Sequence, residues 1–354
     1  MRAARFHGVR DIRIDDVPEP EGELGDKQVL IEPRWCGICG TDLHEYIAGP
    51  IVTPKGAHPL TGATLPQILG HELSAEVVAT GDAVEGLAAG DRVSIMPLTY
   101  CGSCAFCVRG MNHLCVRMGC FGLSDTWGGF ARRAVVHDYQ AWKLPDGVTD
   151  EQGALIEPAA VAAYGAQRGN VAPGDTVLVT GAGPIGALSV LAAYAAGAGQ
   201  VYLAEPNAKR RERAAPLGAT AILDPGSEDV AAALHDATDG LGVDVVLECS
   251  GSEPALQTAI SSVRTRGTVA QVGLHVKDAA IDPMRLAERE ISLVGVWAYD
   301  VHEWPRIMAQ IASGRFPVER AVSDRVGLDE VVSGGFEVLA DPAGAHTKIL
   351  VDPR

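Results

Sequence analysis

The sequence TVLVTGAGPIG, residues 176–186, decides the fold of the second half of the chain. Its first five residues form an apolar, β-branched run that predicts a strand. A Gly-x-Gly-x-x-Gly pattern alone is common in glycine-rich chains, but here an Ala/Leu-rich helix is expected over 187–196 and a strand over 201–204, with Glu205 at its end. This order of strand, glycine turn, helix and strand predicts a dinucleotide-binding parallel sheet.

Each glycine of this turn has a physical role. Gly181 allows the tight turn, Gly183 lets backbone amides approach a pyrophosphate, and Gly186 lets the helix pack on the strand. Pro184 and Ile185 lie between them, and we expect the whole turn to contact the cofactor.

Glu205, 19 residues after Gly186, is expected to select the cofactor. A carboxylate there accepts hydrogen bonds from the ribose hydroxyls and repels a 2′-phosphate, which favours NAD over NADP. The basic run Lys209-Arg210-Arg211 leaves the choice open, because it could bind a phosphate or form the solvated face of a helix.

Three further β-α units are expected to begin at 243–251, 267–273 and 291–296. Strands that alternate with helices predict a parallel sheet whose carboxyl ends form the cofactor crevice. Further cofactor contacts are expected from residues at these strand ends: Val272, Gly273, Leu274, Val296 and Trp297.

Four cysteines in a fifteen-residue window have the spacing C-x2-C-x2-C-x7-C: Cys101, Cys104, Cys107 and Cys115. This spacing lets one lobe offer four thiolates to a tetrahedral zinc, and a closed four-thiolate site leaves no position for substrate. The zinc is therefore predicted to be structural. The alternatives are a disulfide cluster or buried thiols. Reduced, buried thiols are the expected state of Cys36, Cys120 and Cys249.

The first 35 residues predict short strands of a small β-rich lobe, which ends at WCGICGTDLH, residues 35–44. Cys36 and Cys39 alone could form a metal half-site or a redox pair. With Thr41, Asp42 and His44 close behind, the pattern suggests instead a metal-bound thiolate beside a hydroxyl and an imidazole that handle a proton; taken alone, the pattern fits a structural role equally well. Residues 45–67 predict a surface loop, and the His71-Glu72 pair after it could be ordinary polar surface.

Several motifs in fixed order carry a family resemblance: GICGTDLH (37–44), GHE (70–72), the four-cysteine segment and GGFA (128–131). Together they resemble the zinc-dependent medium-chain alcohol dehydrogenases. The loop over 49–62 and IEP at 156–158 look most like the 2,3-butanediol dehydrogenase branch. The resemblance covers nearly the whole chain.

The resemblance implies a second, catalytic zinc with Cys39, His71 and Glu157 as ligands. Glutamate at the third position departs from the liver-type members, which have cysteine. Glu72 is implied to be a catalytic residue, either as an alternate zinc ligand or as a neighbour that contacts the ligands. Thr41 and His44 are implied to carry the proton. Arg210, five positions past the acid, would lie against the adenosine.

The same resemblance implies an α/β architecture with two domains. A GroES-like β-rich catalytic domain is expected over 1–157 and 297–354, and a Rossmann NAD-binding domain with a doubly wound parallel sheet over 158–296. Two zinc ions per subunit are expected. The apolar strand near Ile291–Val296 could pair across a two-fold axis, so a homodimer or homotetramer is expected.

The substrate expected from this reading is (R,R)-2,3-butanediol, oxidised to acetoin and formed in the reverse reaction. Polyol dehydrogenases of similar build place an arginine near the strand end, whereas here Val296-Trp297-Ala298-Tyr299 suits a smaller, less polar diol. Another polyol, such as sorbitol, or threonine are the runner-up substrates. A non-catalytic NAD-binding protein is a more remote alternative, because it would be expected to lack Cys39, His71 and Glu157.

Composition excludes several classes of partner. The 354 residues include 45 acidic and 29 basic side chains, and the net charge of -16 repels nucleic acid. No apolar run approaches the length of a membrane helix, and the N-terminus lacks an apolar signal segment. A cytoplasmic enzyme acting on a small molecule is therefore expected.

Overall fold

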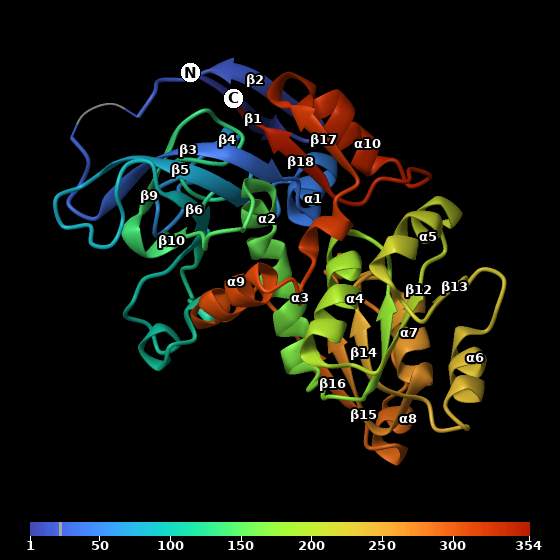
Figure 1. The fold of residues 1–354 in the computed structure, drawn as a ribbon. Helices are drawn as coiled ribbons and strands as arrows, with labels where there is room; N and C mark the ends of the chain where they lie inside the picture. Colours follow the sequence, from blue (N-terminus) through green and yellow to red (C-terminus); the bar gives the residue numbers. More distant parts are fainter. Residues whose placement is uncertain (21–22) are drawn as a thin grey trace. The chain divides into compact units, whose positions relative to one another are not determined.

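The structure, a computed structural model, describes residues 1–20 and 23–354, and its elements are shown in Figure 1. The described chain divides into two compact units. Unit 1 comprises Met1–Glu157, Asp300–Ala312 and Val322–Arg354, and unit 2 comprises Pro158–Tyr299 and Ser313–Ala321. These units differ from the predicted domain ranges at 297–299 and 313–321. The second of these segments joins unit 2 because its helical turn η6 (Val318–Ala321) packs on helix α4 (Pro184–Ala196).

Unit 2 is built on a six-stranded sheet in which every neighbouring pair is parallel. The strands are β11 (Thr176–Thr180), β12 (Gln200–Ala204), β13 (Ala221–Leu223), β14 (Val243–Glu248), β15 (Val263–Gln271) and β16 (Ser292–Gly295). Their order is β13-β12-β11-β14-β15-β16, so the direction of winding reverses between β11 and β14. The predicted doubly wound parallel sheet is confirmed, and β11 leads into the glycine turn at its switch point.

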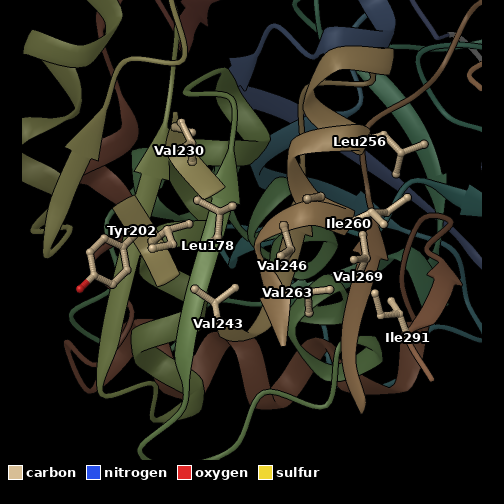
Figure 2. Packing of buried hydrophobic residues seen from close by; sticks show 13 residues of the cluster. Leu178, Tyr202, Val230, Val243, Val246, Leu256, Ile260, Val263, Val269 and Ile291 are labelled. Carbon is tan, nitrogen blue, oxygen red and sulfur yellow. The ribbon is translucent and has the colours of Figure 1, made fainter. Parts of the chain in front are cut away.

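Helices cover both faces of this sheet. Besides α4 they are α3 (Ile156–Arg168), which begins in unit 1, α5 (Ala208–Ala214), α6 (Val230–Ala237), α7 (Glu253–Ser262) and α8 (Pro283–Glu288). Figure 2 shows one face, where Val246 and Val269 of the sheet lie in one apolar cluster with Ile260 of α7. Val177 and Val179 alternate with the cluster residue Leu178 and are also fully buried. Both faces are therefore core, as parallel sheets require.

Unit 1 is dominated by a seven-stranded sheet of order β10-β6-β5-β3-β18-β17, with β9 also pairing β3. Smaller sheets have the orders β2-β1-β4 and β7-β8. The strands are β1 (Arg2–Gly8), β2 (Asp11–Asp16), β3 (Gln28–Gly37), β4 (Gln67–Ile68), β5 (Glu72–Thr80), β6 (Arg92–Ile95), β7 (Leu98–Thr99), β8 (Gly119–Cys120), β9 (Ala134–His137), β10 (Ala141–Lys143), β17 (Asp324–Gly327) and β18 (Ile349–Asp352).

Few helices belong to unit 1: α1 (Gly40–Ala48), α2 (Asp150–Ala154), α9 (Trp304–Ala312), α10 (Glu337–Ala340) and the π-helical η8 (Val331–Phe336). Short helical turns η1 (Cys107–Arg109) and η2 (Asn112–Leu114) shape the cysteine lobe. None of the helices in the described ranges has the length and hydropathy needed to cross a bilayer.

Candidate metal centres and dinucleotide site

Strand pairing in unit 1 brings Cys39 and His71 together. Antiparallel strands β3 and β5 pair Gly37 with Glu72, so the residues just beyond this pair, one after β3 and one before β5, are neighbours. Ligand atoms of Cys39, His71 and Glu72 all lie within 4.8 Å of one another. The register of two strands therefore brings the Cys39 thiol to the imidazole and carboxyl groups of the His71-Glu72 pair, which lie far from it in sequence.

Asp42 orients this group from helix α1. It is fully buried, and its Oδ2 accepts a hydrogen bond from the Cys39 amide at 3.0 Å. Its Oδ1 lies 3.5 Å from Nδ1 of His71, which leaves Nε2 available to a metal. Sequence reasoning assigned Asp42 no role, although its three-residue offset from Cys39 at a helix start was a usable signal.

Lys348 is a second residue that sequence reasoning missed. Its ammonium group is fully buried, forms an ion pair with Glu72 Oε2 and donates to the Ile38 carbonyl at 3.2 Å. A Cβ on Gly37 would lie 2.1 Å from Glu72 Oε2, so only glycine leaves room for this carboxylate. A lone lysine before the apolar strand β18 was the only sequence signal.

The Cys39–His71–Glu72 group has the properties of a cation site. Burial disfavours the charged form of His71, but Asp42 and Cys39 outweigh it and raise its pKa well above the ordinary value. Burial and then Glu72 raise the pKa of Cys39. Glu72 Oε1 is buried without a hydrogen-bond partner among the described residues. A divalent cation would displace the retained protons, and these donor types fit zinc.

Glu157, the predicted third ligand, is not a member of this group. Glu72, the competing ligand, has a carboxylate oxygen within 4.8 Å of the ligand atoms of Cys39 and His71, and its Oε2 forms an ion pair with Lys348. Glu157 is buried in the first turn of α3 and contributes to the raised pKa of Lys348, so it lies in the same region. Glu72 and Glu157 therefore both remain predicted carboxylate ligands.

Thr41 and His44 lie one turn apart on α1, as expected for neighbours on one helix face. The Thr41 hydroxyl oxygen is 3.8 Å from the Cys39 sulfur. His44 is partly buried; this burial lowers its pKa, and Glu45 opposes the shift. The helix thus presents a hydroxyl and a readily deprotonated imidazole beside the metal group.

The four cysteines of the predicted structural site converge, with all four sulfurs within 4.8 Å of one another. The sulfur of Cys107 lies 4.0 Å from that of Cys101 and 3.5 Å from that of Cys104. Sulfurs bound at about 2.3 Å to one tetrahedral zinc are roughly 3.8 Å apart, so the geometry fits. All eight cysteines are free, which disfavours the disulfide alternative.

Electrostatics within the cysteine lobe also favour a cation. Backbone hydrogen bonds, first from Ser103, lower the pKa of Cys101 to about 5, whereas burial raises the pKa of Cys107 to about 12. Backbone amides of Cys101 and Arg117 donate to the Cys115 sulfur at 3.3 and 3.4 Å. The lobe therefore stabilises some thiolates, and a bound cation would allow all four to ionise.

Of the other three cysteines, Cys36 and Cys120 are buried and Cys249 is partly buried. Burial raises the pKa of Cys36 well above its ordinary value, and raises that of Cys120 and Cys249 to about 12. The thiol of Cys249 lies 3.3 Å from the Ser189 hydroxyl.

The glycine turn after β11 has the predicted shape. Gly181 adopts a positive φ of 86°, and a Cβ on Gly186 would lie 1.8 Å from the Gly181 carbonyl oxygen. Gly183 is the N-cap of α4, Pro184 is its first residue and Ile185 its second. A helix N-terminus with such close backbone packing is suited to a phosphate group.

Glu205 is buried at the end of β12 and tied to the glycine turn. Its carboxylate accepts from the Ala182 amide at 2.7 Å and from the Asn207 amide at 2.8 Å. The Arg211 side chain already has partners within the protein, because it forms an ion pair with Asp224 at 2.8 Å and donates a hydrogen bond to the Glu205 carbonyl. Of the basic cluster, Lys209 and Arg210 are left as candidates for a cofactor phosphate.

The remaining predicted cofactor residues lie where β15 and β16 end. Val272 and Val296 are buried, whereas Leu274 and Trp297 are 40% and 47% exposed. Gly273 packs so closely on the neighbouring turn that a Cβ would lie 2.3 Å from the Gly251 amide.

Glu248 was quoted in a strand but given no role. It is fully buried at the end of β14 and accepts from the amides of Ser250 and Gly251 at 2.8 and 3.0 Å. His275 lies 3.3 Å from its other oxygen. Glu248 therefore shapes the turn that faces Gly181.

Comparison with known proteins places the whole chain in one family. Residues 25–146 match the alcohol dehydrogenase GroES-like domain, and residues 184–313 match the zinc-binding dehydrogenase family. An (R,R)-butanediol dehydrogenase of Bacillus subtilis (strain 168) is 39% identical over 357 residues, with 100% of each chain covered. An L-threonine 3-dehydrogenase of Pyrococcus furiosus is 36% identical over 352 residues, covering 99% of this chain and 97% of that one.

The fold agrees with these sequence matches. The crystal structure of a 2R,3R-butanediol dehydrogenase from Bacillus subtilis superposes with a TM-score of 0.92 at 38% identity, covering 100% of this chain and 99% of the other. The resemblance and the GroES-like plus Rossmann architecture expected from the motifs are confirmed. The chain belongs to the zinc-dependent medium-chain alcohol dehydrogenases and is an oxidoreductase of secondary alcohols.

Proposed function

We propose that this enzyme interconverts (R,R)-2,3-butanediol and acetoin with NAD as cofactor. The convergence of Cys39, His71 and Glu72 in one buried group carries the proposal, because it supplies a cation site next to a proton-transfer pair. The four-cysteine lobe would hold a second, structural zinc. Unit 1 would then be the catalytic domain and unit 2 the NAD-binding domain.

Oxidation of a secondary alcohol removes a proton from oxygen and a hydride from carbon. Zinc and NAD, when bound, supply the Lewis acid that lowers the pKa of the hydroxyl group and the acceptor for the hydride. Cys39 and His71 would hold the metal, with Glu72 or Glu157 as carboxylate ligand. Thr41 and His44 would pass the proton outward, and the lowered pKa of His44 keeps its imidazole ready to accept it near neutral pH.

NAD is favoured over NADP by the placement of Glu205. Its carboxylate is buried beside the glycine turn, where a 2′-phosphate would meet like charge. Arg211 is occupied by Asp224 and backbone carbonyls, which weakens the case for a phosphate-binding cluster. Arg210 would lie against the adenosine.

The diol is favoured over other substrates by the full-length similarity to (R,R)-butanediol dehydrogenase. Threonine is the second candidate, since the threonine dehydrogenase relative is nearly as similar. Sorbitol and related polyols follow.

Initial rates of NAD reduction test this proposal on enzyme saturated with zinc. The substrates are (R,R)-, meso- and (S,S)-2,3-butanediol, sorbitol and threonine, and NADP replaces NAD in a parallel series. We expect the diols with an R carbinol centre to be the best substrates and NAD the better cofactor. Activity confined to sorbitol or threonine would move the substrate to another branch of the family.

A further inference from the structure

Helix α1 carries two buried carboxylates on one face. Asp42, Glu45 and Tyr46 are its buried residues, while Thr41 and His44 are partly exposed and Ile47 is 42% exposed. Asp42 serves the metal group, as described above. Glu45 has no part in that group, and its fully buried side chain requires another explanation.

The Glu45 carboxylate binds the backbone that follows α1. It accepts from the amides of Ile51 at 3.0 Å, of Val52 at 2.5 Å and of Thr53 at 3.2 Å, and from the Thr53 hydroxyl at 2.6 Å. A Cβ on Gly49 would lie 2.4 Å from Glu45 Oε2, so the chain passes as close as glycine permits. In the ranges 1–20 and 23–354, no cationic side chain forms an ion pair with Glu45.

A buried charge without a counter-ion is costly unless several donors compensate it. Here the compensating donors are three consecutive backbone amides and one hydroxyl group. The backbone conformation of residues 49–53 therefore depends on the Glu45 carboxylate. A neutral side chain at position 45 would leave those amides poorly paired, and the segment would shift.

The segment held by Glu45 directly follows the helix that carries Thr41 and His44. Ile47 lies one turn beyond His44, and Ile51, whose amide Glu45 binds, is 52% exposed. Two exposed apolar side chains therefore follow the hydroxyl and imidazole that would face the alcohol. A small diol presents this combination of hydroxyl and methyl groups.

We propose that Glu45 is a positioning residue that fixes residues 49–53 beside Thr41 and His44 and thereby sets selectivity for a short diol. The inference rests on the proposed function for the identity of the alcohol. Its geometric part, the anchoring of residues 49–53 by the Glu45 carboxylate, does not depend on which alcohol is used.

The test compares wild type with Glu45→Gln, which keeps the shape but loses the charge and one acceptor. Misplacing substrate-contacting groups by about 1 Å costs up to roughly 100-fold, so we expect kcat/KM for (R,R)-2,3-butanediol to fall about 10- to 100-fold, mainly through KM. The preference for this diol over 2-butanol and sorbitol should shrink, while zinc content and the KM for NAD stay unchanged. Exposed Glu85→Gln is the matched control and should match wild type.

Hydrogen exchange provides a readout that needs no activity. The amides of Ile51, Val52 and Thr53 should exchange slowly in wild type and faster in Glu45→Gln. Thr53→Val removes one donor at nearly constant shape and should give a smaller change in the same direction, which keeps the test open if Glu45→Gln folds poorly.

Two results would overturn the inference: unchanged exchange and selectivity in Glu45→Gln, or equal losses on every alcohol with loss of zinc, which would mark a general structural role. If wild type fails on all butanediols, the proposed substrate is wrong. Hydrogen exchange at residues 51–53, together with the selectivity of wild type and Glu45→Gln for whichever alcohol the enzyme does oxidise, then still tests the role of Glu45.

Discussion

Lys348 and Glu72 form a pair in which neither side chain is exposed to solvent. Because removing one partner strands a buried charge, we expect Lys348→Met to lower the free energy of unfolding by about 3–5 kcal/mol. Urea denaturation of the zinc-loaded protein measures this loss.

The exposed pair Arg2–Asp329 supplies the control for Lys348→Met. Its side chains are 55% and 68% exposed, so Arg2→Met should leave the denaturation midpoint unchanged. Similar losses of unfolding free energy in both variants would contradict the view that burial makes the Lys348–Glu72 pair important for stability.

His44 predicts the pH dependence of diol oxidation. The neutral imidazole accepts the proton, and burial lowers its pKa in spite of Glu45. Oxidation should therefore be at its plateau near pH 7 and fall as the pH drops through the lowered pKa, below about 6.5. The pH profile of kcat/KM measures this, and His44→Gln should lower the plateau about 100-fold or more and remove the limb. An unchanged limb in that variant would assign the titration to another group.

The sequence could predict the site role of a residue only where its partners lie close to it along the chain. Cys39, Thr41 and His44 stand within six positions and His71 lies in a short motif, so their pattern was readable. Lys348 reaches Glu72 only because β18 returns to pair with β3, and no local pattern encodes that contact. No local pattern chooses between Glu72 and Glu157 as the carboxylate ligand either.

At the scale of elements, the cysteine lobe is expected to be a self-contained zinc module. Cys104→Ser should reduce the zinc content by one ion per chain and lower the thermal midpoint, because structural zinc contributes directly to folding. Metal analysis and thermal unfolding check both. Cys249→Ala, which removes a partly buried thiol outside the lobe, should keep both zinc ions.

A stable Cys104→Ser variant with full zinc content would contradict the four-thiolate assignment.

The lobe itself was predictable, since its four ligands fall within fifteen residues. The glycine turn after β11 was predictable for the same reason: strand, turn and helix are contiguous. The assignment of residues 313–321 to unit 2 was not, because it depends on η6 packing against α4.

At the scale of the whole molecule, the chain leaves unit 1 at Glu157 and returns to it at Asp300. Periodicity could not show this return. Only the family resemblance implied a return, which was expected at residue 297, because the pairing of Leu350 with Gly37 joins opposite ends of the chain.

The most direct test of the catalytic assignment is His71→Ala, assayed for zinc content, NAD affinity and oxidation of (R,R)-2,3-butanediol. His71 supplies the imidazole of the buried group, whereas the glycine turn lies in unit 2. We expect two zinc ions per chain in wild type and one in the variant, with turnover abolished and NAD affinity retained. The exposed His302→Ala should behave as wild type. Unchanged turnover in His71→Ala would contradict the assignment of the catalytic metal site.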